Sequence, residues 1–150
     1  TYNTSIGQYG FQVTPLQVVR YAAAIANGGK LLDAHLIAGD QAEGTDIGFT
    51  EEELQIVREG MRASVTDGGT AAALNMSGMS LAGKTGTAQV GTHNQYMNSW
   101  VVGFWPYDNP RYAFAVVLEK GPSKSLSGAS PAMAPFFYWL RDTKPGYIGS

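Results

Sequence analysis

Apolar residues recur at helical spacing in two stretches of the first half of the chain, each with its own start and stop signals. Thr14 is a typical N-cap and Pro15 a typical first helical residue, so a helix is expected to begin there. Gly28 and Gly29 favour the left-handed backbone that ends a helix. A helix over residues 15–26 is therefore predicted. Its expected buried face consists of Leu16, Val18, Val19, Ala22, Ala23, Ile25 and Ala26.

A second helix is predicted to begin after Thr50, because three glutamates follow and one occupies the capping-box position. Negative charge in the first turn also complements the positive end of the helix dipole. Glycines at 68 and 69 end this helix, and Thr70 is expected to cap a short one that reaches Leu74. The buried stripe of the longer helix is predicted to be Leu54, Val57, Met61 and Val65.

Strand patterns dominate the second half of the chain. Residues 80–90, 98–105 and 111–119 are predicted strands, and a short turn makes the last two antiparallel. Both are apolar on both faces, which indicates a sheet covered on each side. A last helix is predicted from Ser130 to about Leu140, with its first turn kinked or separate because of Pro135. Residues 31–37 predict a short strand, and residues 38–48 predict a loop. The expected fold is α/β (α+β): an antiparallel sheet covered by helices on both faces.

Composition excludes several functional classes. The chain has 150 residues and a formal net charge of −2, with no Lys/Arg cluster, which argues against nucleic acid as a partner. No apolar run is long enough to span a bilayer. Cysteine is absent and His35 and His93 are isolated, so no metal site is expected. Trp100, Trp105 and Trp139 are expected in the core.

The candidate chemistry is concentrated in residues 80–90. Side chains alternate faces along a strand, so Thr85 and Thr87 share one face and Lys84 starts from the other. Gly86 carries no side chain that would keep a ligand away from the backbone. At a sheet edge, free backbone N–H groups would also face the ligand. This combination suits an anionic or carbonyl-bearing substrate laid along the strand.

Two known sequence motifs overlap within residues 78–86. Residues 78–85 match the phosphate-loop pattern G-x-x-x-x-G-K-[ST], and residues 84–86 match the K-T-G element of penicillin-binding proteins and β-lactamases. A phosphate loop opens a long helix, whereas residues 86–92 make a poor helix. The context therefore favours K-T-G, and a nucleotide hydrolase or an ordinary glycine-rich turn is the alternative.

The order of motifs resembles class B penicillin-binding proteins along most of the chain. Residues 5–8, 13–17 and 26–29 are similar to the segment that precedes K-T-G in that family, and residues 83–90 to its third sheet strand. Residues 104–110, followed by 115–119, resemble the next two strands. The pattern is more similar to penicillin-binding protein 2, the cell-elongation branch, than to the division branch.

The resemblance implies a D,D-transpeptidase that joins peptidoglycan stem peptides, is acylated by β-lactams and needs no cofactor. Lys84 would supply positive potential beside the nucleophilic serine and the substrate carboxylate. Thr85 and Thr87 would bind that carboxylate, and the Thr87 backbone N–H would be an oxyanion-hole donor. Gly86 would allow close approach of the substrate.

Two of the family's three motifs are missing from the 150 residues: no serine begins S-x-x-K, and none begins S-x-N. The nucleophile and its base are therefore expected in an upstream part of the same protein, and residues 1–150 in the C-terminal part of a transpeptidase domain. Elongation-complex proteins are further expected partners. The expected location is the periplasmic face of the bacterial inner membrane, with the membrane anchor outside this chain. A penicillin-binding fold kept only for interaction is the alternative.

Overall fold

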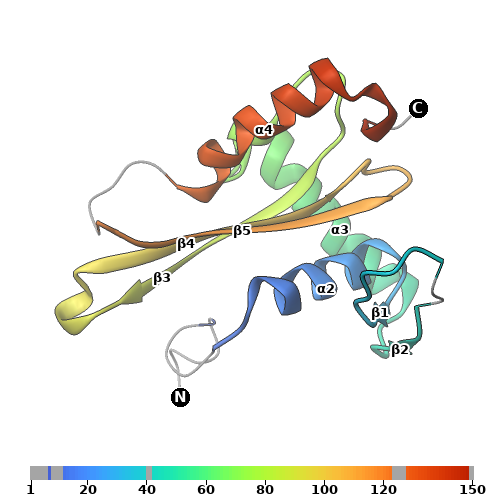
Figure 1. Ribbon diagram of the computed structural model, residues 1–150, viewed down its shortest axis with the longest axis horizontal. Helices are drawn as coiled ribbons and strands as arrows, with labels where there is room; N and C mark the ends of the chain where they lie inside the picture. The colour runs from blue at the N-terminus through green and yellow to red at the C-terminus, as the bar shows by residue number, and fades with distance from the viewer. Residues whose placement is uncertain (1–6, 8–11, 40–41, 123–127, 149–150) are drawn as a thin grey trace.

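The computed structural model describes residues 7, 12–39, 42–122 and 128–148. Its longer strands form an antiparallel sheet in the order β3-β4-β5, and β1 pairs separately with β2 (Figure 1). In chain order the elements are α2 (Pro15–Ala26), β1 (Lys30–Leu32), β2 (Gly44–Asp46), α3 (Glu51–Thr66), η1 (Ala72–Leu74), β3 (Ala82–Val90), η2 (Thr92–Asn94), β4 (Tyr96–Trp105), β5 (Tyr112–Pro122), α4 (Ala129–Thr143) and η3 (Pro145–Tyr147).

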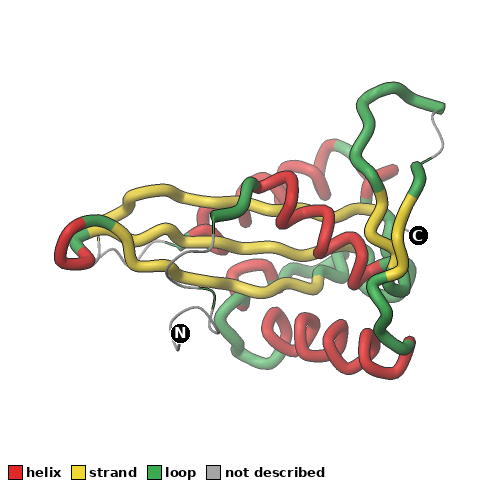
Figure 2. The backbone as a smooth tube through the Cα atoms, turned by 90° about the horizontal axis from the view of Figure 1, so that it is seen from below, coloured by secondary structure: helices red, strands yellow, loops and turns green. Residues whose placement is uncertain are grey.

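Helices cover both faces of the three-stranded sheet. In Figure 1, α4 lies on one side of the sheet, and α2 and α3 lie on the other. Figure 2 shows the strands side by side, with the connection between β3 and β4 projecting beyond the helices. The predicted fold class and the three predicted strands are therefore confirmed. Among the helices of the described residues, none is both long and apolar enough for a bilayer.

The main core lies between the sheet and α4. Phe137 of α4 is fully buried and meets Phe114 and Trp105 edge-on, with ring centroids 5.1 and 5.3 Å apart. The neighbouring strands approach closely at Gly103, where an added Cβ would lie only 2.1 Å from the Ala82 carbonyl oxygen. A second cluster packs on the opposite face; its buried members are Ala26, Met61, Ala82 and Phe104.

Both predicted helix starts are confirmed, and each is a complete capping box, although such a box was predicted only at Thr50. The Thr14 backbone N–H donates to Gln17 Oε1 at 2.8 Å, and the Gln17 N–H donates back to the Thr14 hydroxyl. Thr50 and Glu53 repeat the arrangement at the start of α3. These bonds link residues three apart, so sequence alone is enough to predict them.

The predicted helix faces are wrong at two positions. Leu16 is 57% exposed and Val57 is 45% exposed. The C-terminal end of the first helix meets the sheet, where Ala26 packs in one cluster with Ala82 and Phe104, whereas Leu16 lies in the first turn. In α3, only the narrower stripe of Leu54, Met61 and Val65 is buried.

The region between the first two helices also differs from the prediction. The strand expected over residues 31–37 ends at Leu32, and the predicted loop 38–48 contains β2. The length of β1 is set by its pairing, because among the described residues it pairs with the three residues Gly44–Asp46. After the strand, Asp33 pairs with Arg20 at 2.6 Å, and Leu36 is fully exposed.

Three further expectations near the C-terminal half are wrong. Thr70 does not cap η1, whose N-cap is Ala71 with no side-chain hydrogen bond. The last helix is one element, Ala129–Thr143, with Pro135 inside it, so its first turn is not separate. Trp139 lies on the outer side of that helix and is 50% exposed, so it is not a core residue.

Candidate substrate-binding edge on strand β3

The four candidate residues lie on β3, which has β4 as its single partner among the described residues. Thr85 pairs with Val101, which is buried in the core beneath α4. Lys84 pairs with Val102, and both line a cavity on the α2 side. The predicted alternation is therefore confirmed: the threonines point to the α4 side, and Lys84 points to the α2 side.

The start of β3 is held in place by α3. Arg62 Nη1 donates to the Leu81 carbonyl oxygen at 2.6 Å. The Ser64 hydroxyl donates to the Gly83 carbonyl oxygen. An added Cβ at Gly83 would lie 3.3 Å from the Val102 carbonyl oxygen, so a glycine fits this close approach. These contacts fix the position of the backbone immediately before Lys84.

Lys84 is exposed, and its ammonium donates to the Thr85 carbonyl oxygen. Within the part of the chain that the structure describes, this lysine forms no ion pair. Its charge is therefore available to an anionic group that approaches the strand. A lysine ammonium is a compact point charge with three rotatable donors, so it suits electrostatic stabilisation.

A cavity of about 480 Å³ separates α2 from this part of the sheet. Val18 and Tyr21 line it from the helix, while Lys84, Gly86 and Trp100 line it from the sheet. Burial raises the pKa of the Tyr21 hydroxyl, so this group stays protonated at neutral pH and can donate a hydrogen bond. Thr85 and Thr87 also belong to its lining. Among the described residues, the cavity therefore combines apolar walls with the Lys84 cation and a few polar groups, as ligand sites commonly do.

On the α4 side, sequence reasoning missed two hydroxyl contacts, one that joins Thr70 to Thr85 and one that joins Ser99 to the start of α4. Thr70 Oγ1 lies 2.6 Å from Thr85 Oγ1. Ser99, opposite Thr87 on the neighbouring strand, accepts a hydrogen bond from the Ala129 backbone N–H at 2.9 Å. No local pattern signals either contact, because the partners are 15 and 30 residues apart.

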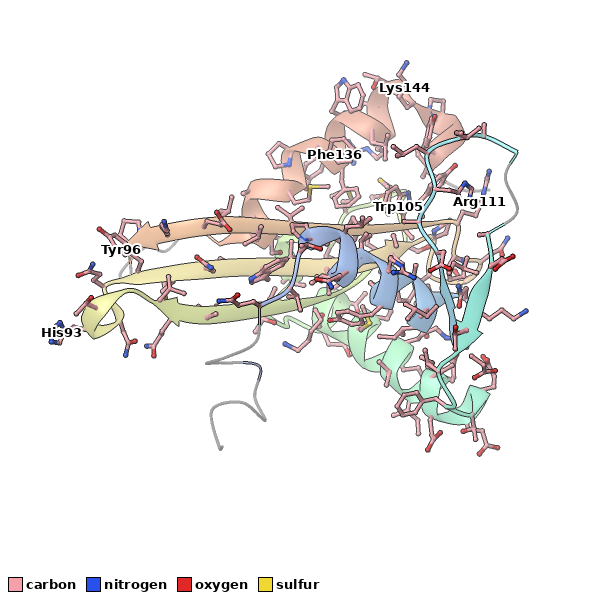
Figure 3. All side chains as sticks on the ribbon, turned by 60° about the horizontal axis from the view of Figure 1, so that its bottom comes forward. His93, Tyr96, Trp105, Arg111, Phe136 and Lys144 are labelled. Atoms are coloured by element: carbon pink, nitrogen blue, oxygen red, sulfur yellow. The ribbon has the colours of Figure 1, made fainter. Side chains whose placement is uncertain are left out.

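His93 lies far from Trp105 and Arg111, which are at the opposite end of the sheet (Figure 3). Figure 3 shows it at the free end of the β3–β4 connection, close to Tyr96. His35 is also exposed. Within the described residues, no group of three or more His, Cys, Asp or Glu side chains is arranged to hold a metal ion.

The arrangement can bind and polarise a substrate. An edge strand offers backbone N–H groups, Lys84 offers charge, and Thr85 and Thr87 offer hydroxyls within a few residues. Among the described residues, no hydrogen bond joins a serine hydroxyl to a lysine, histidine or carboxylate side chain. An activated nucleophile needs such a partner, so these residues do not form an acylation centre by themselves.

The phosphate-loop interpretation is wrong. Lys84 and Thr85 lie inside β3, which continues to Val90. The next helical segment is η2, with only three residues. A phosphate loop presents its amides at the start of a long helix, and no such helix follows here.

Comparisons with known proteins agree on one family. The family model described as "Penicillin binding protein transpeptidase domain" matches residues 1–138. The chain is 33% identical to the peptidoglycan D,D-transpeptidase PbpA of Mycolicibacterium smegmatis, covering 87% of this chain and 29% of that protein. It is also 33% identical to the peptidoglycan D,D-transpeptidase MrdA of Acinetobacter baumannii, covering 99% of this chain and 25% of the relative. The chain thus spans less than a third of the length of these relatives.

Solved structures give the same result. Penicillin-binding protein PBP2 from Helicobacter pylori superposes with a TM-score of 0.75 at 33% identity, covering 94% of this chain and 26% of that one. The transpeptidase domain of Burkholderia pseudomallei penicillin-binding protein 3 superposes with a TM-score of 0.72 at 24% identity, which shows a shared fold. That match covers 91% of this chain and 44% of the solved one. The chain belongs to the penicillin-binding protein transpeptidase domain family.

Proposed function

We propose that the complete protein is a serine-type peptidoglycan D,D-transpeptidase and that residues 1–150 form the C-terminal part of its transpeptidase domain. The names of the relatives support this activity. The match to 44% of a solved transpeptidase domain supports the assignment to part of such a domain. In the proposed reaction, a serine attacks the stem-peptide carbonyl, D-alanine leaves, and an amine of a second strand attacks the acyl-enzyme.

The observation that carries the proposal is the geometry of β3. A lysine free of ion pairs in the described residues lies between a close-packed glycine and two hydroxyl residues, on a strand with an open edge. Lys84 stabilises negative charge beside the serine, and the Thr87 backbone N–H is one oxyanion-hole donor. Thr85 and Thr87 bind the terminal carboxylate of the stem peptide, and Gly86 leaves room for its backbone.

The nucleophilic serine and its base are the serine and lysine of an S-x-x-K motif in the upstream part of the same protein, which also carries S-x-N. β-Lactams are trapped as acyl-enzymes at that serine. Since Helicobacter pylori PBP2 has been solved in a complex with MreC, elongation-complex proteins of that kind are the proposed partners. The proposed location is the periplasmic face of the inner membrane, where peptidoglycan is assembled.

Labelling of the complete protein with a fluorescent penicillin tests this function. We expect a covalent band on a denaturing gel, lost when unlabelled β-lactam is added first, together with cross-linked product from stem pentapeptides. Folded complete protein that gives neither band nor product would instead favour a penicillin-binding fold kept for interaction.

A further inference from the structure

Thr70 lies where no sequence pattern predicts a role in the candidate site. Its hydroxyl oxygen is 2.6 Å from the Thr85 hydroxyl oxygen, within hydrogen-bonding distance. It is not used as a helix cap, since the N-cap of η1 is Ala71 and no side chain bonds there. The Thr70 hydroxyl therefore bonds to Thr85 and does not cap the short helix η1 that follows it.

The segment that carries Thr70 is held rigidly against α3. The Ala71 N–H donates to the Ser64 carbonyl oxygen at 3.1 Å, and Ala71 is fully buried. The chain passes so closely that a Cβ added at Gly69 would lie 2.5 Å from that same oxygen. The Ser64 side chain also donates to Gly83 on β3. Two contacts, at Gly83 and Thr85, thus fix this strand to the end of α3.

Hydroxyl chemistry gives the Thr70 contact a direction. A threonine hydroxyl has one proton to donate and lone pairs that accept, whereas an ionised carboxylate only accepts. If Thr85 binds a carboxylate, its single proton must point to that group. In the structure the Thr85 hydroxyl donates to Thr70, so this bond must reverse and run from the Thr70 hydroxyl to the Thr85 oxygen when Thr85 donates to a carboxylate. Hydrogen bonds in such a chain polarise and strengthen one another.

We propose that Thr70 is a positioning residue that sets the Thr85 hydroxyl as a donor to the anionic end of the substrate. This inference rests on the proposed function, in which Thr85 binds the terminal carboxylate. Thr70 itself does not touch the substrate. In the described residues Thr70 is bonded to Thr85 and not to Thr87, so its effect passes through one threonine of the pair.

The first test compares two ligands in the complete protein: a penicillin with a free carboxylate and the methyl ester of the same compound. Thr70→Val keeps the shape of the side chain and removes the hydroxyl. We expect the apparent dissociation constant of the acid before acylation to rise about three- to tenfold, with little change in the acylation rate constant. Binding of the ester should be unchanged. Thr70→Ser should restore binding of the acid.

A double-mutant cycle separates positioning from general damage. Combined with Thr85→Val, Thr70→Val should add nothing, because no Thr85 hydroxyl is left to orient. Combined with Thr87→Val, its effect should multiply with that of the second substitution. Thr143→Val is the matched control, since its hydroxyl bonds to the Trp139 carbonyl oxygen at the far end of α4.

The outcomes distinguish this proposal from the proposed function. Equal losses for acid and ester, independent effects of Thr70→Val and Thr85→Val, or unchanged binding of the acid would each overturn the role of Thr70. Failure of the wild-type complete protein to be acylated at all would overturn the proposed function instead.

Discussion

Charge and hydroxyls reach the edge of β3 from opposite faces of the sheet. Lys84 pairs across the sheet with Val102 on the cavity side, while Thr85 and Thr87 pair with Val101 and Ser99 on the side of α4. The backbone between them lies at the edge. A peptide laid along the strand can therefore meet the Lys84 ammonium, the threonine hydroxyls and the backbone N–H groups. Each kind makes a different contribution, and single substitutions separate them.

Lys84→Ala in the complete protein should slow acylation by a β-lactam by about 100-fold or more, because it removes preorganised charge where negative charge develops. Stopped-flow or gel-based acylation kinetics measure the effect. Lys144→Ala is the control, since this lysine is also exposed but follows the end of α4 (Figure 3). Near-normal acylation of folded Lys84→Ala would contradict the electrostatic role.

Thr87→Val should weaken recognition of the carboxylate while leaving the backbone N–H in place. Loss of one hydrogen bond of this kind corresponds to about a three- to tenfold slower acylation at low ligand concentration. Thr87→Ser, which keeps the hydroxyl, is the matched variant and should stay close to wild type in the same kinetic assay. Damage as large as that of Lys84→Ala would reverse the proposed ranking of the two residues.

At the scale of elements, strand β4 caps helix α4. The helix begins at Ala129 after Gly128, which has no side chain to cap it. The Ser99 hydroxyl accepts the first N–H of the helix instead, at 2.9 Å. An added Cβ at Gly128 would lie 3.1 Å from that hydroxyl oxygen, so the glycine leaves space for the contact.

Ser99→Ala should therefore lower the free energy of unfolding by about 1 kcal/mol, the usual value of a lost helix cap. Urea unfolding of the complete protein measures it. Ser99→Thr keeps the hydroxyl and should lose less, while Ser77→Ala, at an exposed serine, should change nothing. Equal stabilities of Ser99→Ala and Ser77→Ala would show that the contact contributes nothing to stability.

Two aromatic residues two positions apart on α4 should respond very differently to truncation. Phe137 is fully buried against Trp105 and Phe114, so Phe137→Ala should cost about 3–5 kcal/mol of stability. Trp139 is 50% exposed, so Trp139→Ala should change stability by about 0.5 kcal/mol. The same unfolding experiment compares them, and similar losses would mean that the outer side of α4 is covered in the complete protein.

At the scale of the whole molecule, apolar surface borders the candidate site. Val13, Leu16 and Tyr21 are each about half exposed, and two of them line the cavity beside Lys84. The β3 edge is open among the described residues. Such a surface is expected to be covered when the upstream part of the proposed domain is present.

The 150-residue chain alone should therefore be poorly soluble and should not be labelled by fluorescent penicillin. Acylation needs a nucleophile activated by an adjacent base, and these residues contain no S-x-x-K. Adding the upstream part of the protein in trans should restore both solubility and labelling. A covalent band on the 150-residue chain by itself would show that the nucleophile lies within it.

The sequence by itself determined the features that depend on neighbouring residues. Both capping boxes join residues three apart, and the glycine stops and the alternation along β3 are equally local. The candidate residues from Lys84 to Thr87 followed from a motif within that strand. Short-range hydrogen bonds and side-chain periodicity depend directly on the order of residues, which is why the helix starts, the glycine stops and the alternation along β3 were predicted correctly. The roles of Lys84 to Thr87 stay predictions.

Only the tertiary structure decided which distant residues meet. The bond between Thr70 and Thr85, the capping of α4 by Ser99, and the pairing of β1 with three residues of the expected loop each join separate segments. Exposure of Leu16 and Trp139 likewise depends on what packs beside their helices. The residue type is the same whether a hydroxyl is paired or free and whether an apolar side chain is buried or exposed. The role of each side chain therefore depends on the neighbours that folding brings to it.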